Sequence, residues 1–414
     1  MKFTIGYGKG QKQFVIEDKN LLACVIPNVV TTEVSGEQAV KLSLENPVAS
    51  KRLSEIVQKG ETVAIITSDI TRPVPSKIIL SYVIDELVRG GVNKNDITVV
   101  FALGSHRKHT EEEKRYLVGD KVYESVRCID SDANDCVHCG TTSSGTPVDI
   151  FRVVLEADRR VCVGNIDYHY FAGYSGGAKA IMPGVSTREA IQANHKMMVM
   201  EGAVAGAIEG NPVRQDIEEA AKFLPIDFIV NVVLDEKKSI VKSVAGHYIE
   251  AHRDGCRFLD NMYKVKIPRR ADIVVTTPGG YPKDINLYQA QKAIDNAKYA
   301  VRDGGIMIFI GSCAEGFGES VFEKWMMEAG SKEDLISRVK TNFELGGHKA
   351  AAIALVLSKV KIFAVTDLEP EIIEKSFMQH FESVEKALDA AYKELGRDAE
   401  VLVIPYGGSV LPGA

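Results

Sequence analysis

Short apolar runs that alternate with helical patterns constrain the fold of this chain more than any other feature. Residues 61–67 form such a run, and Pro75 then opens a helical pattern that stops at Gly90 and Gly91. Proline in the first turn and glycine after the last turn are typical helix boundaries. A second buried strand is predicted at residues 97–102. This alternation predicts an α/β fold with a largely parallel sheet.

The alternation continues through the chain with one interruption. The basic, proline-containing stretch 264–270 interrupts the pattern and predicts a domain boundary. Further strands are predicted at 160–163, 228–234, 273–277, 306–310, 361–365 and 401–404, and further helices at 285–301 and 384–395. We therefore predict two α/β domains, residues 1–268 and 269–414, with an active-site cleft between them.

Composition and charge narrow the classes of partner. The 414 residues are 45% hydrophobic and 26% charged, which is typical of a globular protein of about two domains. The net charge of -6 and the lack of a polybasic run do not indicate nucleic-acid binding, so a small-molecule partner is expected. No apolar stretch approaches the roughly 20 residues that cross a bilayer, and the first ten residues alternate like a strand. We expect a cytoplasmic protein without a membrane segment.

The seven cysteines are scattered, which argues against a disulfide framework. Cys136 and Cys139 have the spacing of half a zinc or redox site. Because no second pair follows at zinc-site spacing, we expect reduced thiols in a loop.

Polar residues follow the first two predicted strands, where ligands of open α/β sheets gather. Asp69 and Arg72 follow the first strand, and Arg72 precedes a proline, so an extended backbone would let its guanidinium bind a carboxylate or phosphate. A turn cap and a surface ion pair are the alternative. His106 follows the second strand, with His109 as a competing candidate, and a solvated loop histidine is equally common.

A third predicted strand leads into His169 and the glycine-rich run 171–179. Glycines permit positive φ and a close approach of amides to an anion, and a helix starting at Ala178 would add its positive end. The run matches neither a Walker loop nor the Gly-x-Gly-x-x-Gly motif. Phosphate binding is therefore predicted only from the backbone freedom of the glycines and from the helix end that would follow them.

Two imidazoles and an amine surround this run. A capping box at residues 186–189 predicts a helix that carries His195, although a core histidine would fit that place equally well. Imidazole suits proton transfer and metal binding, and desolvation makes a lysine such as Lys179 nucleophilic. With His169, these groups are typical of a cofactor-dependent active site.

Tyr288 and Lys292 lie four residues apart on a predicted helix, with Gln289 beside them. The tyrosine and the lysine must share a face, so both could reach across the cleft, although an ordinary amphipathic surface explains them too.

Together these segments resemble the nickel-dependent lactate racemase family over nearly the whole chain. The spacings of ten and sixteen residues from His169 to Lys179 and from Lys179 to His195 fit that family. The residues that carry the resemblance are Asp69, Arg72, His106, the run from Gly164 to Gly184, Asn194 with His195, and Tyr288, Gln289 and Lys292.

The resemblance implies racemisation of lactate or a related 2-hydroxy acid by reversible hydride transfer to a nickel-pincer nucleotide. In that cofactor, one carbon and two sulfurs of pyridinium-3,5-bisthiocarboxylic acid mononucleotide hold the nickel, and dedicated biosynthetic proteins make it. The resemblance further implies that His195 binds nickel, that Lys179 can tether the cofactor through a thioamide, and that His106 and His169 are the acid/base pair. Arg72 and Lys292 would act on the substrate, and the implied cofactor contacts are Asp69, Tyr174, Ser175, Gly176, Gly177, Tyr288 and Gln289.

Other functions stay open at this point. Family members also act on larger 2-hydroxy acids, such as sugar acids and malate-like or aromatic acids, and the residues for the substrate side chain are not identifiable. A non-catalytic metal- or mononucleotide-binding protein would use the same histidines as ligands. A zinc hydrolase is disfavoured because its His-Glu-x-x-His helix is missing. The sequence assigns no role to His109, His348 or the Cys136 and Cys139 pair, and no oligomeric state.

Overall fold

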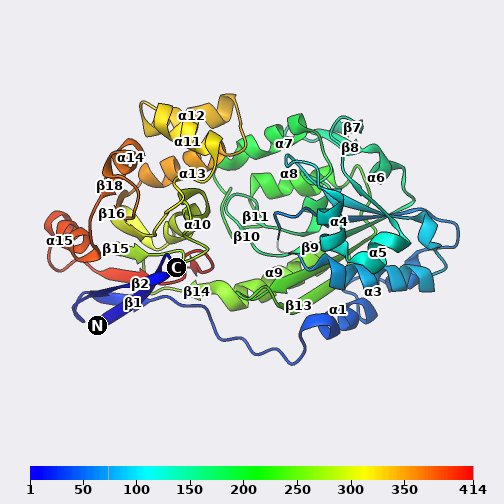
Figure 1. The fold of residues 1–414 in the computed structure, drawn as a ribbon, viewed down its shortest axis with the longest axis horizontal. Coiled ribbons are helices and arrows are strands. Elements are labelled where there is room, and N and C mark those ends of the chain that lie inside the picture. The colour runs from blue at the N-terminus through cyan, green and yellow to red at the C-terminus, as the bar shows by residue number, and fades with distance from the viewer. Residues whose placement is uncertain (73, 414) are drawn as a thin grey trace. The chain divides into compact units, whose positions relative to one another are not determined.

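The computed structural model describes residues 1–72 and 74–413. The chain divides into a central unit, Val30–Asp260, and a terminal unit made of Met1–Val29 and Asn261–Ala414. Both are α/β units, as predicted (Figure 1). Pro73, on which the predicted extended conformation of Arg72 rested, lies outside the described residues.

A six-stranded sheet forms the middle of the central unit. Its order is β13-β12-β9-β4-β5-β6, and all neighbours are parallel except β12 and β13. The strands are β4 (Val63–Ser68), β5 (Ile97–Ala102), β6 (Arg127–Asp130), β9 (Arg159–Asn165), β12 (Phe228–Leu234) and β13 (Ile240–Gly246). These strands confirm the predictions at 61–67, 97–102, 160–163 and 228–234. Short apolar runs of this kind are typical of strands that are buried on both faces of a parallel sheet.

Helices cover this sheet. The apolar residues Ile79, Val83 and Leu87 recur once per turn of α3 (Ser76–Arg89) and are fully buried against the strands. The helix ends at Gly90, as predicted. The other elements of the unit are α1 (Gly36–Glu45), α2 (Leu53–Ile56), η1 (Lys94–Asp96), α4 (Glu111–Val118), α5 (Asp120–Ser125), β7 (Cys136–Thr141), β8 (Pro147–Phe151), α6 (Arg152–Glu156), β10 (Tyr168–His169), β11 (Gly173–Tyr174), η2 (Gly177–Ala180), α7 (Arg188–His195), η3 (Lys196–Val199), α8 (Pro212–Ala220) and α9 (Glu250–Tyr263).

The terminal unit contains a second six-stranded sheet, in the order β18-β17-β16-β15-β19-β3, in which all neighbours are parallel. Its strands are β3 (Leu21–Cys24), β15 (Ala271–Thr276), β16 (Val301–Ile310), β17 (Lys361–Val365), β18 (Gln379–His380) and β19 (Val401–Ile404). The helix predicted at 285–301 ends at Ala297, and Val301 already belongs to β16.

The division of the chain differs from the predicted domains 1–268 and 269–414. Residues 1–29 belong with the C-terminal part because β3 pairs with β19, a partner almost 380 positions away that no local pattern reveals. The basic stretch 264–270 lies inside the terminal unit, where Lys264–Lys266 forms β14 and pairs with β20 (Leu411–Gly413).

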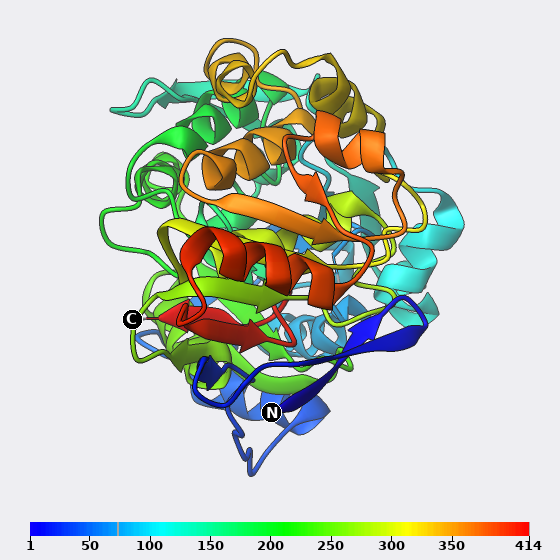
Figure 2. The same cartoon turned by 90° about the vertical axis from the view of Figure 1, so that its left-hand side faces the viewer.

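One face of the terminal sheet is covered by α15 (Val384–Leu395) and by the hairpin of β1 (Lys2–Tyr7) and β2 (Gly10–Val15), with Phe3 and Phe14 stacked in the core (Figure 2). The remaining helices are α10 (Leu287–Ala297), α11 (Ser320–Glu328), α12 (Lys332–Thr341), α13 (Gly347–Leu357) and α14 (Pro370–Lys375). Within the described part of the chain, no helix combines the length and apolarity needed to span a membrane.

Candidate active site

The order in which the chain adds strands to the central sheet reverses at β4. From this strand the chain continues to β5 and β6 on one side, and β9 and β12 lie on the other. Loops that leave such a switch point in opposite directions open a ligand site beyond the carboxyl ends of the strands. Asp69 and Arg72 follow β4, His106 follows β5, and His169 follows β9, so all four predicted residues lie at this edge.

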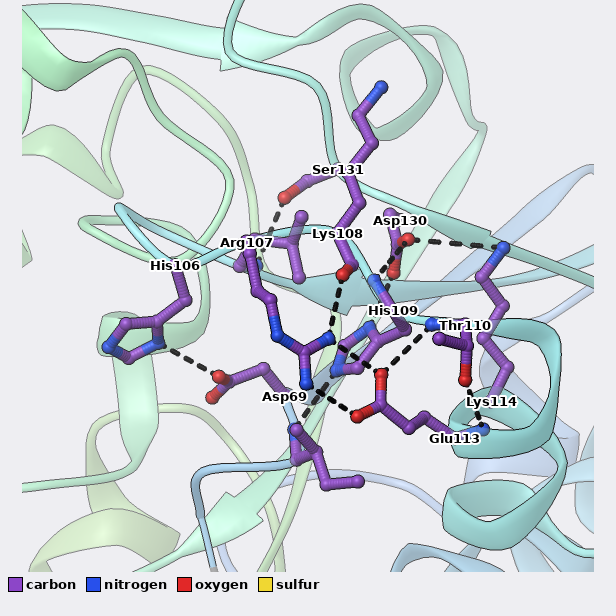
Figure 3. A network of polar contacts seen from close by, with 12 residues as sticks. Asp69, His106, Arg107, Lys108, His109, Thr110, Glu113, Lys114, Asp130 and Ser131 are labelled. Atoms are coloured by element: carbon purple, nitrogen blue, oxygen red, sulfur yellow. Dashed lines mark hydrogen bonds and ion pairs between the residues drawn. The ribbon is translucent and has the colours of Figure 1, made fainter.

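His106 is backed by a buried carboxylate. Its Nδ1 lies 2.8 Å from Oδ2 of Asp69, whose side chain is 4% exposed while that of His106 is 28% exposed (Figure 3). The Thr71 hydroxyl also donates to Asp69. Burial opposes ionisation of Asp69, but the bond and charge of His106 outweigh it, so the pKa of Asp69 lies below its ordinary value. The carboxylate orients the ring through Nδ1 and leaves Nε2 available to a ligand. From the sequence, Asp69 is predicted to contact the cofactor, and this contact with His106 is not predicted.

His169 has the opposite surroundings. It lies on β10, which pairs with β11, and its Nδ1 accepts a hydrogen bond from the Ala172 amide at 3.3 Å. Its ring contacts Phe171 edge to face, and Phe171 contacts His195 in the same way. Dense packing, and then the charges of Lys179 and His195, hold the pKa of His169 well below its ordinary value. These surroundings favour the neutral form of the His169 imidazole.

Lys179 lies on η2, directly after the glycine-rich run. Removal from water is the largest cause that holds the pKa of its amine well below the usual range, and the charges of Arg214 and Arg72 add to it. No carboxylate contributes to this shift. A cluster of cations that lower one another's pKa is complementary to an anion, and a neutral amine is nucleophilic.

Arg214, on α8, is a residue of this site that sequence reasoning missed. Its side chain is buried, and it donates to the carbonyls of Ala172 and Tyr174, on either side of Gly173. Its Nη1 is buried without a hydrogen-bond partner, and burial lowers its pKa to about 10. A buried guanidinium that lacks an ion pair is costly unless an anion compensates it. No motif marked it, because helix α8 reads as an ordinary amphipathic helix.

The glycine-rich run differs from its predicted form. Gly173, Gly176 and Gly177 have φ of 76°, 76° and 60°, as expected, and a Cβ at Gly173 would lie 1.9 Å from the Ala207 carbonyl oxygen. The amide of Gly177, however, donates to Asn231. The helix expected from Ala178 is only the four-residue η2, which has no useful dipole. The Gly177 amide and a helix dipole are therefore not available to an anion as predicted, and the positive charge near the run comes from the side chains of Lys179 and Arg214.

Tyr174 and Ser175 hold the run in place. The Tyr174 hydroxyl donates to Asp260 at 2.8 Å, and the Ser175 hydroxyl donates to the Asn165 carbonyl at 2.8 Å. From below, Nε2 of the buried His252 binds the Ser175 carbonyl at 2.8 Å. The side chains of Tyr174 and Ser175 thus serve the loop, and their contact with a cofactor stays a prediction.

His195 is the last residue of α7, whose N-cap is Thr187 rather than the predicted Ser186. Nδ1 of His195 lies 3.0 Å from Oδ1 of Asn194, whose amide nitrogen donates to Asp216. Since Oδ1 of Asn194 can only accept, the proton of the imidazole sits on Nδ1 and the lone pair on Nε2. A metal-binding histidine is oriented in this way by the partner of its other nitrogen.

The last three predicted residues lie in the terminal unit, on α10. Gln289 and Lys292 are exposed and Tyr288 is partly buried. Nζ of Lys349 lies 3.7 Å from the centre of the Tyr288 ring and donates to the Tyr288 carbonyl. The i and i+4 residues share a face, as predicted, and their action across a cleft stays a prediction.

The cysteine pair lies on strand β7 rather than in the predicted loop, and its thiols have the properties of unreactive groups. Burial, and then the charge of Asp149, raises the pKa of Cys136 to about 12 and also raises that of Cys139. Both are free, and the described residues contain no cluster of three or more histidine, cysteine or acidic side chains that could hold a metal.

Comparison with known proteins places the chain in a family. Residues 7–206 match the lactate racemase N-terminal domain, and residues 266–411 match the lactate racemase C-terminal domain. The lactate racemase of Thermoanaerobacterium thermosaccharolyticum is 34% identical over 98% of each chain, and that of Lactiplantibacillus plantarum is 32% identical over 96% of each.

Solved structures agree with this assignment. The lactate racemase apoprotein of Thermoanaerobacterium thermosaccharolyticum superposes with a TM-score of 0.90 at 33% identity and covers 100% of both chains. A Thermotoga maritima protein, with a TM-score of 0.65 at 18% identity over 92% of this chain and 99% of its own, shares the fold. The chain therefore belongs to the lactate racemase family of isomerases.

Proposed function

We propose that this protein racemises lactate, or a closely related 2-hydroxy acid, with a nickel-pincer nucleotide as its cofactor. The observation that supports this most directly is the pair of imidazoles at the switch point. A carboxylate backs His106, and burial holds the pKa of His169 well below its ordinary value. Two bases are needed because the two enantiomers present their hydroxyl groups on opposite sides.

The residues fit an anionic metal-bearing nucleotide. Arg72, Lys179 and the Nη1 of Arg214, which is buried without a hydrogen-bond partner, would hold phosphate and thiocarboxylate groups. The charges of Arg214 and Arg72 both lower the pKa of Lys179, so an anion would relieve this repulsion. The lowered pKa of Lys179 suits an amine that forms a thioamide, and the Nε2 lone pair of His195 suits nickel. When bound, the cofactor supplies reversible hydride transfer at the α-carbon of the substrate.

Hydride chemistry removes a difficulty that proton abstraction would face. Loss of the α-proton of a 2-hydroxy acid leaves a carbanion beside a carboxylate, with no carbonyl group to spread the charge. Loss of the hydroxyl proton by itself needs only a base within hydrogen-bond reach. The protein's own task is therefore to move the hydroxyl proton and to hold the substrate still.

One histidine would take the hydroxyl proton of the incoming enantiomer, and the other, already protonated, would return a proton to the opposite enantiomer. The two rings would then regain their starting states by proton exchange with solvent. His106 accepts through Nε2 while Asp69 stabilises the imidazolium that forms. His169 accepts as a neutral base, with no carboxylate among the charges that set its pKa. The exposed Arg72, which follows Asp69 in the same loop, would bind the substrate carboxylate through two hydrogen bonds.

The test begins with protein made in cells that also make the cofactor-biosynthesis proteins. Its intact mass and nickel content are measured, and chiral chromatography follows the inversion of lactate and of a panel of larger 2-hydroxy acids. We expect stoichiometric nickel, an added mass that maps to Lys179, and fastest inversion of lactate. Lys179→Ala is the matched control and should lose the added mass.

Inversion of a sugar acid or an aromatic 2-hydroxy acid in preference to lactate would change the substrate and keep the reaction. A fully nickel-loaded preparation that inverts no member of the panel would contradict the proposal and favour a binding protein.

A further inference from the structure

The loop that carries Asp69 and Arg72 is held from behind by a second histidine. The amide of Ile70, directly after Asp69, donates to Nε2 of His109 at 3.0 Å. The Arg72 amide closes the turn by donating to the Asp69 carbonyl at 3.1 Å. The position of the Asp69 backbone thus depends on a side chain outside the loop.

His109 is itself fixed by an aspartate. Its Nδ1 lies 2.6 Å from Oδ1 of Asp130, at the end of β6, and its own amide donates to Oδ2 at 3.0 Å (Figure 3). The side chains of His109 and Asp130 are 1% and 7% exposed. Because the Ile70 amide can only donate, Nε2 of His109 must accept, so the ring proton sits on Nδ1 and goes to Asp130. This places the imidazole as a fixed bridge between two strand ends.

Further contacts surround the bridge. The ring of His109 packs edge to face on Phe101 of β5, with centroids 5.2 Å apart. Thr110 and Glu113 form a reciprocal capping box at the start of α4. The next charge beyond Asp130 is Lys114, whose Nζ lies 3.9 Å from Oδ2. The segment between His106 and α4 is therefore held by contacts to β5, to β6 and within the start of α4.

We propose that His109 and Asp130 are positioning residues for the reaction, which set the loop after β4 so that the Asp69 carboxylate meets His106. This inference rests on the proposed function of His106 as a base. His109 contacts neither substrate nor cofactor in this arrangement, because both of its nitrogens are engaged inside the protein. Its effect passes from Asp130 through the ring to the Ile70 amide, and from there to the adjacent Asp69.

The test compares His109→Gln with His109→Leu in the cofactor-loaded enzyme. The amide oxygen of glutamine can take the place of Nε2 and accept from Ile70, whereas leucine keeps the volume and removes the acceptor. We expect the leucine variant to lose roughly 10- to 100-fold in kcat, as is usual for partners that orient a functional side chain, and the glutamine variant to recover most of it.

Backbone deuterium exchange of the apoprotein supplies a readout that is independent of activity. In His109→Leu, the peptide that contains Ile70 should exchange faster, and peptides from α3 and β9 should keep their rates. His138→Leu is the matched control, because His138 pairs with Asp149 at a similar 2.7 Å but is 60% exposed on the β7–β8 hairpin. That control should change neither readout.

Unchanged kcat and unchanged exchange at Ile70 in the leucine variant would overturn the inference. Equal losses in the glutamine and leucine variants, with faster exchange across the whole central unit, would also overturn it, because that result indicates a purely structural residue. If the unmodified holoenzyme inverts no 2-hydroxy acid, the proposed function fails, whereas the exchange result still reports on the bridge.

Discussion

The imidazoles of His106 and His169 lie at the same edge of one sheet and meet opposite electrostatic surroundings. His106 faces the buried Asp69 carboxylate, which would stabilise a positive ring. His169 faces Lys179, His195, Arg72 and Arg214, all of which oppose a positive ring. If the two rings are the two bases of the proposed reaction, those bases have different electrostatic surroundings.

The difference follows from which loops meet each ring. The loop after β4 brings a carboxylate to His106, whereas the glycine-rich run and α8 bring only cations to His169. Those cations suit an anionic ligand, so a bound nucleotide would make the surroundings of the two rings more similar. The asymmetry of the apoprotein is therefore expected to shrink in the holoenzyme.

The largest effect is expected from removing either ring. His106→Ala and His169→Ala should each lower the racemisation rate by roughly 10²- to 10⁴-fold, the usual contribution of a positioned acid/base group. Steady-state rates in both directions, with nickel content as the control, would measure this. Near-normal racemisation by either variant would remove the two-base scheme.

Replacement of Arg214 should mainly affect the groups near His169, above all Lys179. Arg214→Met removes a buried cation, so the pKa of Lys179 should rise and its trace acylation near neutral pH should slow severalfold, as followed by peptide mass spectrometry of the apoprotein. Arg214→Lys keeps the charge and serves as the matched control. Equal labelling of Lys179 in all three proteins would show that Arg214 does not act on it.

Asp69→Asn tests the His106 side with the shape of the residue preserved. The amide keeps a hydrogen-bonding oxygen but loses the charge that supports a positive ring, so we expect kcat to fall roughly 10- to 100-fold. Thr71→Val, which removes only the hydroxyl next to Asp69, should have a smaller effect. An Asp69→Asn enzyme with wild-type kcat would mean that the carboxylate only shapes the loop.

Protonation of His169, which lies among cationic side chains, should also lower the free energy of unfolding in acid. A group that the fold keeps neutral binds fewer protons folded than unfolded, so its pKa is lowered and unfolding becomes easier as the pH falls. For His169 this loss of stability begins as the pH falls below 6.5, the ordinary pKa of histidine. The stability that the ionised Asp69 contributes is lost only as the pH falls below 3.8, the ordinary pKa of aspartate. Denaturant unfolding of the apoprotein between these values should show a shallower decline in His169→Ala, and an identical decline would contradict the burial argument.

The smallest effect is expected far from both rings. Because burial keeps the thiols of Cys136 and Cys139 protonated, the double replacement by serine should leave kcat within about twofold and nickel content unchanged. A loss of nickel in that variant would reveal a metal role that the described geometry lacks.

Sequence reasoning found the strands and the polar residues that follow them, because buried runs such as 97–102 and 228–234 carry a local signal. It missed β3, whose partner is β19, since pairing across the chain leaves no local trace. Arg214 and Asp130 were missed for a related reason. They reach the site from α8 and β6, and only the folded backbone shows that their side chains point there.

The most direct test of the account is the fate of the carbon-bound hydrogen. The two histidines are proposed to move only the hydroxyl proton, so fully loaded enzyme that racemises α-deuterated lactate in ordinary water should leave the deuterium on carbon. Complete washout of the deuterium into solvent at the rate of racemisation would contradict the account.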